Sequence, residues 1–281
     1  MAKSSKKLAE LVNRMPDPDG RGLYCTDIDK EKIESAIAEI HQGGRRNILG
    51  IIDMLVPPGK GDDVKAHYAL HVLGLHVCKL DDDEPRRRFA KALASQLGGD
   101  RPKAVQAYLV QELQAFGGKE VVETLGRLLT DEELCQPAAM ALVAIGDGAA
   151  EPLRSALPRA RGKCRLVVVQ NLGVVRDAAS AYALREAVAD EDQAVRIAAT
   201  WALGNIGEAG SVDLLLRTAD KTNGWERIRA TKACLLLAEK LLASGRKNAA
   251  VRIYTHLRNT RTDPAEHYVR DAARSALAEA G

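Results

Sequence analysis

A string of small and apolar residues recurs near the end of the chain, and it limits the possible folds more than any other feature. The pattern Val-Arg-x-Ala-Ala-x-x-Ala-Leu-x-x-x-Gly occupies residues 195–207 and returns at residues 269–281. A degenerate copy at residues 134–146 keeps the alanines, the leucine and the terminal glycine. Self-similarity of this kind is typical of a stack of repeated structural units.

The spacing within the string predicts a helix. Val195, Ala198, Ala199, Ala202 and Leu203 follow one another at intervals of three, one, three and one, which gives a broad apolar face at 3.6 residues per turn. Alanines on that face permit close packing against the next unit. The glycine that ends the string suits a left-handed C-terminal cap, where a side chain would clash.

Acidic and basic residues flank the start of the same helix. Asp192 lies favourably against the positive end of the helix dipole, and it can also reach Arg196 four residues later. Ile228 and Arg229 open a further copy, whereas the copy that ends at Arg176 lacks the terminal glycine.

The repeat length indicates a helical hairpin. Successive terminal positions at 117, 146, 176 and 207 lie 29 to 31 residues apart, which is room for two helices of three to four turns and their turns. We therefore expect an all-α chain. The expected helices are 31–42, 45–56, 62–79, 85–98, 101–116, 118–130, 132–145, 148–157, 163–175, 178–189, 192–206, 209–219, 225–244, 246–258 and 265–280.

The string from Asp192 to Gly207 resembles the short HEAT-like repeats of phycobilin lyase subunits and of bacterial scaffold proteins. This resemblance implies a right-handed α-solenoid, a superhelix of about seven to eight hairpins, in which the second helix of each hairpin lines the concave surface. It implies little about function, because such repeats serve unrelated partners.

The sequence predicts one solenoid domain over residues 30–281, because no Ser/Gly-rich linker divides it. Residues 1–29 depart from the repeat pattern. Their 6–14 stretch predicts a short amphipathic helix, the 16–22 run predicts a loop, and together they are expected to cap the first repeat.

The net charge and the cysteines indicate which partners and which cellular compartment to expect. The net charge of +3, from 41 basic and 38 acidic residues, does not by itself indicate a nucleic-acid binder. Five widely spaced cysteines without a CxxC pair are typical of a reducing compartment. No stretch approaches the roughly 20 apolar residues of a membrane span. We expect a cytoplasmic protein that does not enter membranes.

Three histidines and a cysteine suggest a metal site, which we weigh against ordinary packing. His67 and His71 share a helix face, whereas an ideal helix places His76 opposite His67, and Cys78 follows two residues later. The ligand set is incomplete, and the paired His-Glu dipeptides of HEAT-type iron hydroxylases do not occur. The sequence therefore predicts no metal and no cofactor.

Basic residues provide the candidate binding site. Arg86, Arg87 and Arg88 follow the acidic run 81–84, where the simplest interpretation is a capped, solvated helix start. The others surround one loop or lie on second helices. Acidic residues on the same helices favour a protein or peptide ligand over the phosphate backbone of a nucleic acid. These residues are Arg154, Arg159, Arg161, Lys163, Arg165, Arg185 and Arg217.

The sequence lacks a phosphate-binding glycine loop, a nucleophile elbow and a specific Cys/His pair. We therefore expect a non-enzymatic scaffold that docks a protein or peptide on the concave face. Two alternatives stay open. One is nucleic-acid binding through a local Arg/Lys patch, and the other is an accessory subunit of an enzyme such as a cofactor-attachment lyase.

Overall fold

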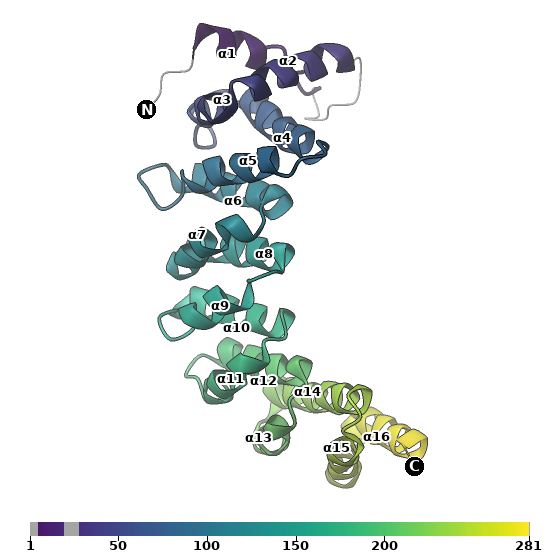
Figure 1. The fold of residues 1–281 in the computed structure, drawn as a ribbon. Coiled ribbons are helices and arrows are strands. Elements are labelled where there is room, and N and C mark those ends of the chain that lie inside the picture. Colours follow the sequence, from purple (N-terminus) through teal and green to yellow (C-terminus); the bar gives the residue numbers. More distant parts are fainter. Residues whose placement is uncertain (1–4, 20–27, 281) are drawn as a thin grey trace. The chain divides into compact units, whose positions relative to one another are not determined.

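The computed structural model describes residues 5–19 and 28–280. The described residues contain helices and 3₁₀ turns and no strand (Figure 1). The fold is an α-solenoid built from stacked helical hairpins. It divides into two compact units, one ending at Pro152 and one beginning at Leu153, whereas the sequence predicts a single domain over 30–281.

The first unit consists of a cap followed by hairpins. Its helices are α1 (Lys6–Val12), α2 (Lys30–Gln42), α3 (Gly44–Ile52), α4 (Val64–Cys78), α5 (Glu84–Ala94), α6 (Lys103–Phe116), α7 (Val122–Arg127) and α8 (Cys135–Ile145). From α2 onward, the even-numbered helix is the first of each hairpin and the odd-numbered helix is the second.

The second unit continues the same order. The division falls within α9 (Ala150–Ala156). The helices that follow are α10 (Gly162–Val174), α11 (Ala181–Ala187), α12 (Gln193–Ile206), α13 (Val212–Lys221), α14 (Gly224–Ala243), α15 (Lys247–Thr260) and α16 (His267–Ala280). Every expected helix is present, with ends displaced by a few residues.

Three second helices, α7, α11 and α13, are shorter than expected because a 3₁₀ turn takes up their first residues. These turns are η1 (Lys119–Val121), η3 (Ala178–Ser180) and η4 (Ala209–Ser211), with η2 (Leu128–Thr130) after α7 and η5 (Pro264–Glu266) before α16. The tighter turn lets the chain reverse within a few residues of each first helix.

The N-terminal cap contains the expected short helix. Ser5 accepts a hydrogen bond from the backbone N–H of Leu8, as an N-cap residue does. Leu8, Leu11 and Val12 are buried against α2, α3 and α4. The helix therefore covers the apolar end of the first hairpin. Residues 20–27, including Cys25 and the last part of the expected 16–22 loop, lie outside the described residues.

A glycine–alanine contact repeats every 31 residues in the second unit. A side chain on Gly173 of α10 would place its Cβ 2.8 Å from Ala202 of α12, and one on Gly204 would lie 2.7 Å from the backbone oxygen of Ala233 in α14. Trp201 also packs against Gly173. Successive first helices thus touch nearly backbone to backbone.

The terminal glycine of the motif behaves as predicted in the best copy and differently elsewhere. Gly207 caps α12 in the left-handed conformation with φ +80°. Gly117 instead has φ −74° and ψ 157°, which is extended, so the left-handed interpretation is wrong there. Arg176 stands where the glycine is missing and keeps a positive φ of 54°. The backbone turn therefore persists at that position despite the side chain.

No helix among the described residues is long and apolar enough to cross a membrane.

Candidate binding surfaces

Three arginines spaced 31 residues apart join successive repeats of the second unit. Arg165, Arg196 and Arg227 lie in the first turns of α10, α12 and α14. Each donates to a carboxylate that belongs to the next repeat, namely Asp190, Glu226 and Glu266, at 2.6 to 2.9 Å. We call these three residues the arginine ladder.

Each guanidinium of the arginine ladder also donates to a backbone carbonyl in the segment that precedes its own helix. Arg165 donates to the carbonyl of Leu157, Arg196 to those of Asp190 and Glu191, and Arg227 to that of Ala219. One side chain therefore links three consecutive segments. Planar guanidinium groups with several donors suit such bridging, whereas a lysine would supply only a point charge.

Two of the carboxylates that pair with the arginine ladder, Asp190 and Glu226, are stabilised in their charged form. The hydrogen bond from Arg196 lowers the pKa of Glu226, although burial opposes it. Burial alone would raise the pKa of Asp190, but the hydrogen bonds from Arg165 and from the backbone of Asp192 more than offset that effect. Both pKa values lie below the ordinary range, so both groups are ionised at neutral pH.

Two sequence expectations are wrong at these positions. Asp192 caps α12 by accepting from the N–H of Ala194, while Arg196 reaches forward to Glu226 and not to its neighbour at i−4. The repeat copy expected to begin at Ile228 and Arg229 is offset by two residues. Arg227, and not Arg229, is the residue equivalent to Arg196. Arg229 lies over the ring of exposed Trp225, 5.6 Å from its centroid.

A second set of ion pairs joins the second helices. Arg154 of α9 donates twice to Asp177, at 2.9 and 2.8 Å, and Arg185 of α11 donates to Glu208 at 2.6 Å. Both members of the second pair lie 31 residues beyond those of the first. These pairs hold each second helix to the turn that begins the next one.

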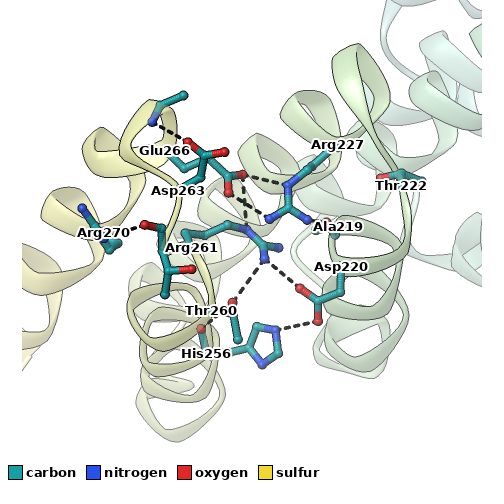
Figure 2. Close-up of polar contacts among 12 residues, drawn as sticks. Ala219, Asp220, Thr222, Arg227, His256, Thr260, Arg261, Asp263, Glu266 and Arg270 are labelled. Atoms are coloured by element: carbon teal, nitrogen blue, oxygen red, sulfur yellow. Dashed lines mark hydrogen bonds and ion pairs between the residues drawn. The ribbon is translucent and has the colours of Figure 1, made fainter.

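The arginine ladder ends in a polar cluster around Arg261 (Figure 2). Arg261 has only 1% of its surface exposed and donates to Asp220 at 2.8 Å, and Asp220 also contacts His256 at 2.8 Å. Figure 2 shows Glu266 between Arg227 and Arg261. The cluster fastens α13, α14 and α15 to the turn that begins α16.

The structure therefore divides the predicted basic residues into two groups. Arg154, Arg165 and Arg185 take part in the inter-repeat pairs described above. Arg159, Lys163 and Arg217 are exposed, as is Arg161, which donates to the carbonyls of Pro158 and Ala160. Only the members near the loop between α9 and α10 lie close together, since Arg217 is on α13.

The arginines at the start of α5 belong to the first unit and are not placed relative to the others. Arg86 is half-buried and bonds Asp83, Glu120 and the carbonyl of Phe116, at 2.6 to 2.9 Å. Arg88 pairs with Glu84, and Arg87 is exposed. The Asp83 side chain bonds Arg86 and accepts no capping hydrogen bond from the α5 backbone, so Asp83 provides no side-chain cap at this helix start.

The histidines of α4 point toward two different neighbouring helices. His71 contacts both carboxylate oxygens of Glu112 on α6 at 3.2 Å, and His67 packs against Tyr108 and contacts Asp63. His76 faces the other way, toward His41 of α2 at 3.3 Å. Within the described residues, no three His, Cys, Asp or Glu side chains are arranged to hold a metal ion.

Glu112 is a buried carboxylate that the sequence gives no reason to single out. Its exposure is 5%, and burial raises its pKa against the opposing influence of His71. The residue occupies a position on α6 next to core residues, so its burial depends on how closely α4 packs. No local sequence signal reveals this.

An open groove lies between α2 and α4 in the first unit. It has a volume of about 520 Å³. Apolar side chains from α4, from α2 and from the second residue before α2 line most of the groove, with Leu75 42% exposed. They are Ile28, Ile33, Ile37, Ala38, Tyr68, Val72 and Leu75. The remaining lining residues are Lys30, Glu34, His76 and Lys79.

Sequence reasoning missed this groove. Tyr68, Val72 and Leu75 have the spacing of an ordinary core stripe. Whether such a stripe is covered depends on how neighbouring helices are placed, and the sequence does not give that placement.

A protein-family model now adds to this geometry. Residues 150–235 match the model described as HEAT repeats. This segment consists of HEAT repeats. It contains all three residues of the arginine ladder, both glycine–alanine contacts and the strongest sequence copy. No curated protein sequence matched the chain.

Three solved structures match the chain at low identity. A chain from the complex of CpcE and CpcF of phycocyanin lyase from Nostoc sp. PCC7120 matches with 16% identity and a TM-score of 0.41, covering 82% of this chain and 94% of that one. Human deoxyhypusine hydroxylase in complex with glycerol matches with 18% identity and a TM-score of 0.34, covering 97% and 95%. An engineered protein matches with 21% identity and a TM-score of 0.30, covering 99% and 98%.

Proposed function

We propose that this chain is a non-catalytic scaffold that binds a protein or peptide partner, and that the groove between α2 and α4 is a docking site. One observation carries the proposal: the groove presents an open, largely apolar surface between α2 and α4, with Leu75 exposed at its edge. Contiguous apolar surface with a polar rim is typical of protein interaction sites.

The basic residues on the second helices fit this proposal less well as a docking surface. Arg154 and Arg185 already satisfy carboxylates of the neighbouring repeat. A ligand that recruited them would first have to break these hydrogen bonds, which lowers the net gain from binding. Val72 and Leu75 of the groove have apolar side chains, so covering them breaks no side-chain hydrogen bond.

Affinity purification from the native source with three versions of the full chain tests the proposal. The versions are wild type, Leu75→Asp in the groove, and Met140→Asp on α8 as a matched control at a similarly exposed position. A protein partner should be retained by wild type and by the control and lost with Leu75→Asp. Recovery of nucleic acid alone, of no partner, or of the same partner with all three versions would contradict the proposal.

A second candidate function is nucleic-acid binding by the exposed basic residues near the loop between α9 and α10. Arg159 and Lys163 are exposed there, and Arg161 lies between them. This candidate predicts binding to duplex DNA that weakens steeply with salt and is lost in the double variant Arg159→Ala/Lys163→Ala. Absence of binding at low salt would remove it.

A further inference from the structure

The groove between α2 and α4 has features that indicate the kind of partner. On α4, Tyr68, Val72 and Leu75 occupy positions i, i+4 and i+7, which is one face of the helix. Ile33 and Ile37 of α2 are buried and form the floor of the groove. A groove with an apolar floor and a ridge of this spacing along one side accepts another helix, whose side chains pack against the ridge.

The length of the groove also suits a short helix. Its lining on α4 and just beyond runs from Tyr68 to Lys79, and at about 1.5 Å per residue this is roughly 16 Å, or three helical turns. Binding by β-strand addition would need a free sheet edge, and the described residues contain no strand. A helix satisfies its own backbone hydrogen bonds, so it can enter an apolar groove without such an edge.

The charges on the groove are unequal. Lys30 at the first residue of α2 and Lys79 just after α4 are both exposed, and Glu34 is the single carboxylate in the lining. Within the part of the chain that the structure describes, neither lysine forms an ion pair. Burial and the neighbouring His41 and Lys79 lower the pKa of His76, so that imidazole adds no charge at neutral pH.

We propose that the groove binds a short amphipathic helix of a partner protein, with acidic residues placed to meet Lys30 and Lys79. This inference rests on the proposed scaffold function and specifies its partner. The apolar face of the helix supplies affinity by covering Val72 and Leu75, while the acidic residues fix its position along the groove.

Selection from a random peptide library tests this inference without knowledge of the partner. The probe is a phage-displayed library of peptides about 15 residues long, enough for a four-turn helix, and the target is the full chain. Selected sequences should carry apolar residues at i, i+3 or i+4, and i+7, with acidic residues toward their ends. Selection of proline-rich, unpatterned or basic sequences, or no enrichment at all, would overturn the inference.

Binding of a selected peptide to variants then locates it and tests the charges. Leu75→Asp should weaken binding at least about tenfold, whereas Met140→Asp should leave it unchanged. The double reversal Lys30→Glu/Lys79→Glu should weaken the acidic peptide about tenfold and favour a version with lysine in place of its acidic residues. An unchanged preference after the reversal would contradict the acidic-helix inference.

The two proposals can fail separately. A native partner that is lost with Leu75→Asp supports the scaffold proposal whatever peptides are selected. If that partner inserts an extended segment, or if its binding ignores the reversal of Lys30 and Lys79, the scaffold proposal stands and the acidic-helix inference is wrong.

Discussion

The two units of the chain use their polar residues differently. In the second unit, Arg165, Arg196 and Arg227 repeat at one spacing and join successive hairpins in the same way. In the first unit, contacts between hairpins differ from one to the next, as with His71 and Glu112 or Arg86 and Glu120. In the second unit, the arginines that pair with carboxylates of neighbouring repeats are not available for ligands. The first unit has no such regular series and contains the apolar groove between α2 and α4.

The difference also appears in how closely helices approach. Gly173 and Gly204 bring first helices of the second unit against the backbone of the next one. In the first unit, Gly74 of α4 faces the ring of Phe116 on α6 instead. A stack held by backbone contacts tolerates little change, whereas side-chain contacts allow each hairpin its own geometry. We therefore expect substitutions to be more costly in the second unit.

The largest expected effect follows from filling a glycine contact. Gly204→Val would place its Cβ 2.7 Å from the backbone oxygen of Ala233, and this backbone cannot rotate away. We expect a loss of about 3 kcal/mol in the free energy of unfolding of the second unit. Hydrogen exchange resolved by segment checks this, because it reports each unit separately. Gly99→Val is the control, since a Cβ there meets nothing within 4 Å.

Removing one member of the arginine ladder should have the next largest effect. Arg196→Met leaves Glu226, whose side chain is 13% exposed, without its guanidinium partner. We expect a loss of about 2 kcal/mol, which is below the value for a fully buried pair because water reaches Arg196. Arg87→Met, at an exposed site, should stay within about 0.5 kcal/mol of wild type. Equal stabilities of the two variants in chemical denaturation would refute the structural role of the arginine ladder.

The pH dependence of stability should differ in sign between two carboxylates. The hydrogen bond from Arg196 lowers the pKa of folded Glu226, so its contribution is present above the unfolded pKa and is lost as the pH falls through the folded pKa. Burial raises the pKa of Glu112, so its charged form opposes folding and that cost lessens as the pH falls. Glu226→Gln should therefore make the free energy of unfolding decrease less steeply as the pH falls. Glu112→Gln should make it decrease more steeply.

Denaturation midpoints measured from neutral pH down to about pH 4, where unperturbed carboxylates titrate, check this prediction. If the slope of the denaturation midpoint against pH changed in the same direction in both variants, the prediction would be wrong.

The smallest expected effect concerns the missing glycine of the repeat. Arg176 has a positive φ of 54°. This backbone conformation is unfavourable for any residue that carries a Cβ, so it destabilises the folded state. Arg176→Gly should raise stability by about 0.5 kcal/mol, because relief of this strain slightly exceeds the entropy that glycine adds to the unfolded chain. Gly207→Ala, at φ +80° and with its Cβ 2.8 Å from that of Lys240, should lower it. Thermal melts of both variants test the opposite signs.

Much of the fold could be predicted because its determinants are local. The spacing of Val195, Ala198 and Ala202 specifies a helix face, and Gly207 specifies its end, since both depend only on 3.6 residues per turn and on backbone sterics. The partner of Arg196 could not be predicted in the same way. A local candidate, Asp192, is four residues away, and only the packing offset between repeats brings Glu226 closer.

The candidate site was less predictable for the same reason. The arginines at 154, 165 and 185 have the charge expected of a binding stripe, yet their carboxylate partners lie 23 to 25 residues later in the chain. The exposure of Leu75 likewise depends on how α2 lies against α4, which involves two hairpins. Binding at any of these positions stays a prediction until a partner is found.

Hydrogen–deuterium exchange of the full chain, with and without the protein partner recovered from its native source, tests the contrast between the units most directly. The account predicts added protection in α2 and α4, where an apolar groove is covered, and no change over residues 153–281, where the arginines serve the repeats themselves. Protection centred on α11, α13 and the loop between α9 and α10, with α2 and α4 unaffected, would contradict it.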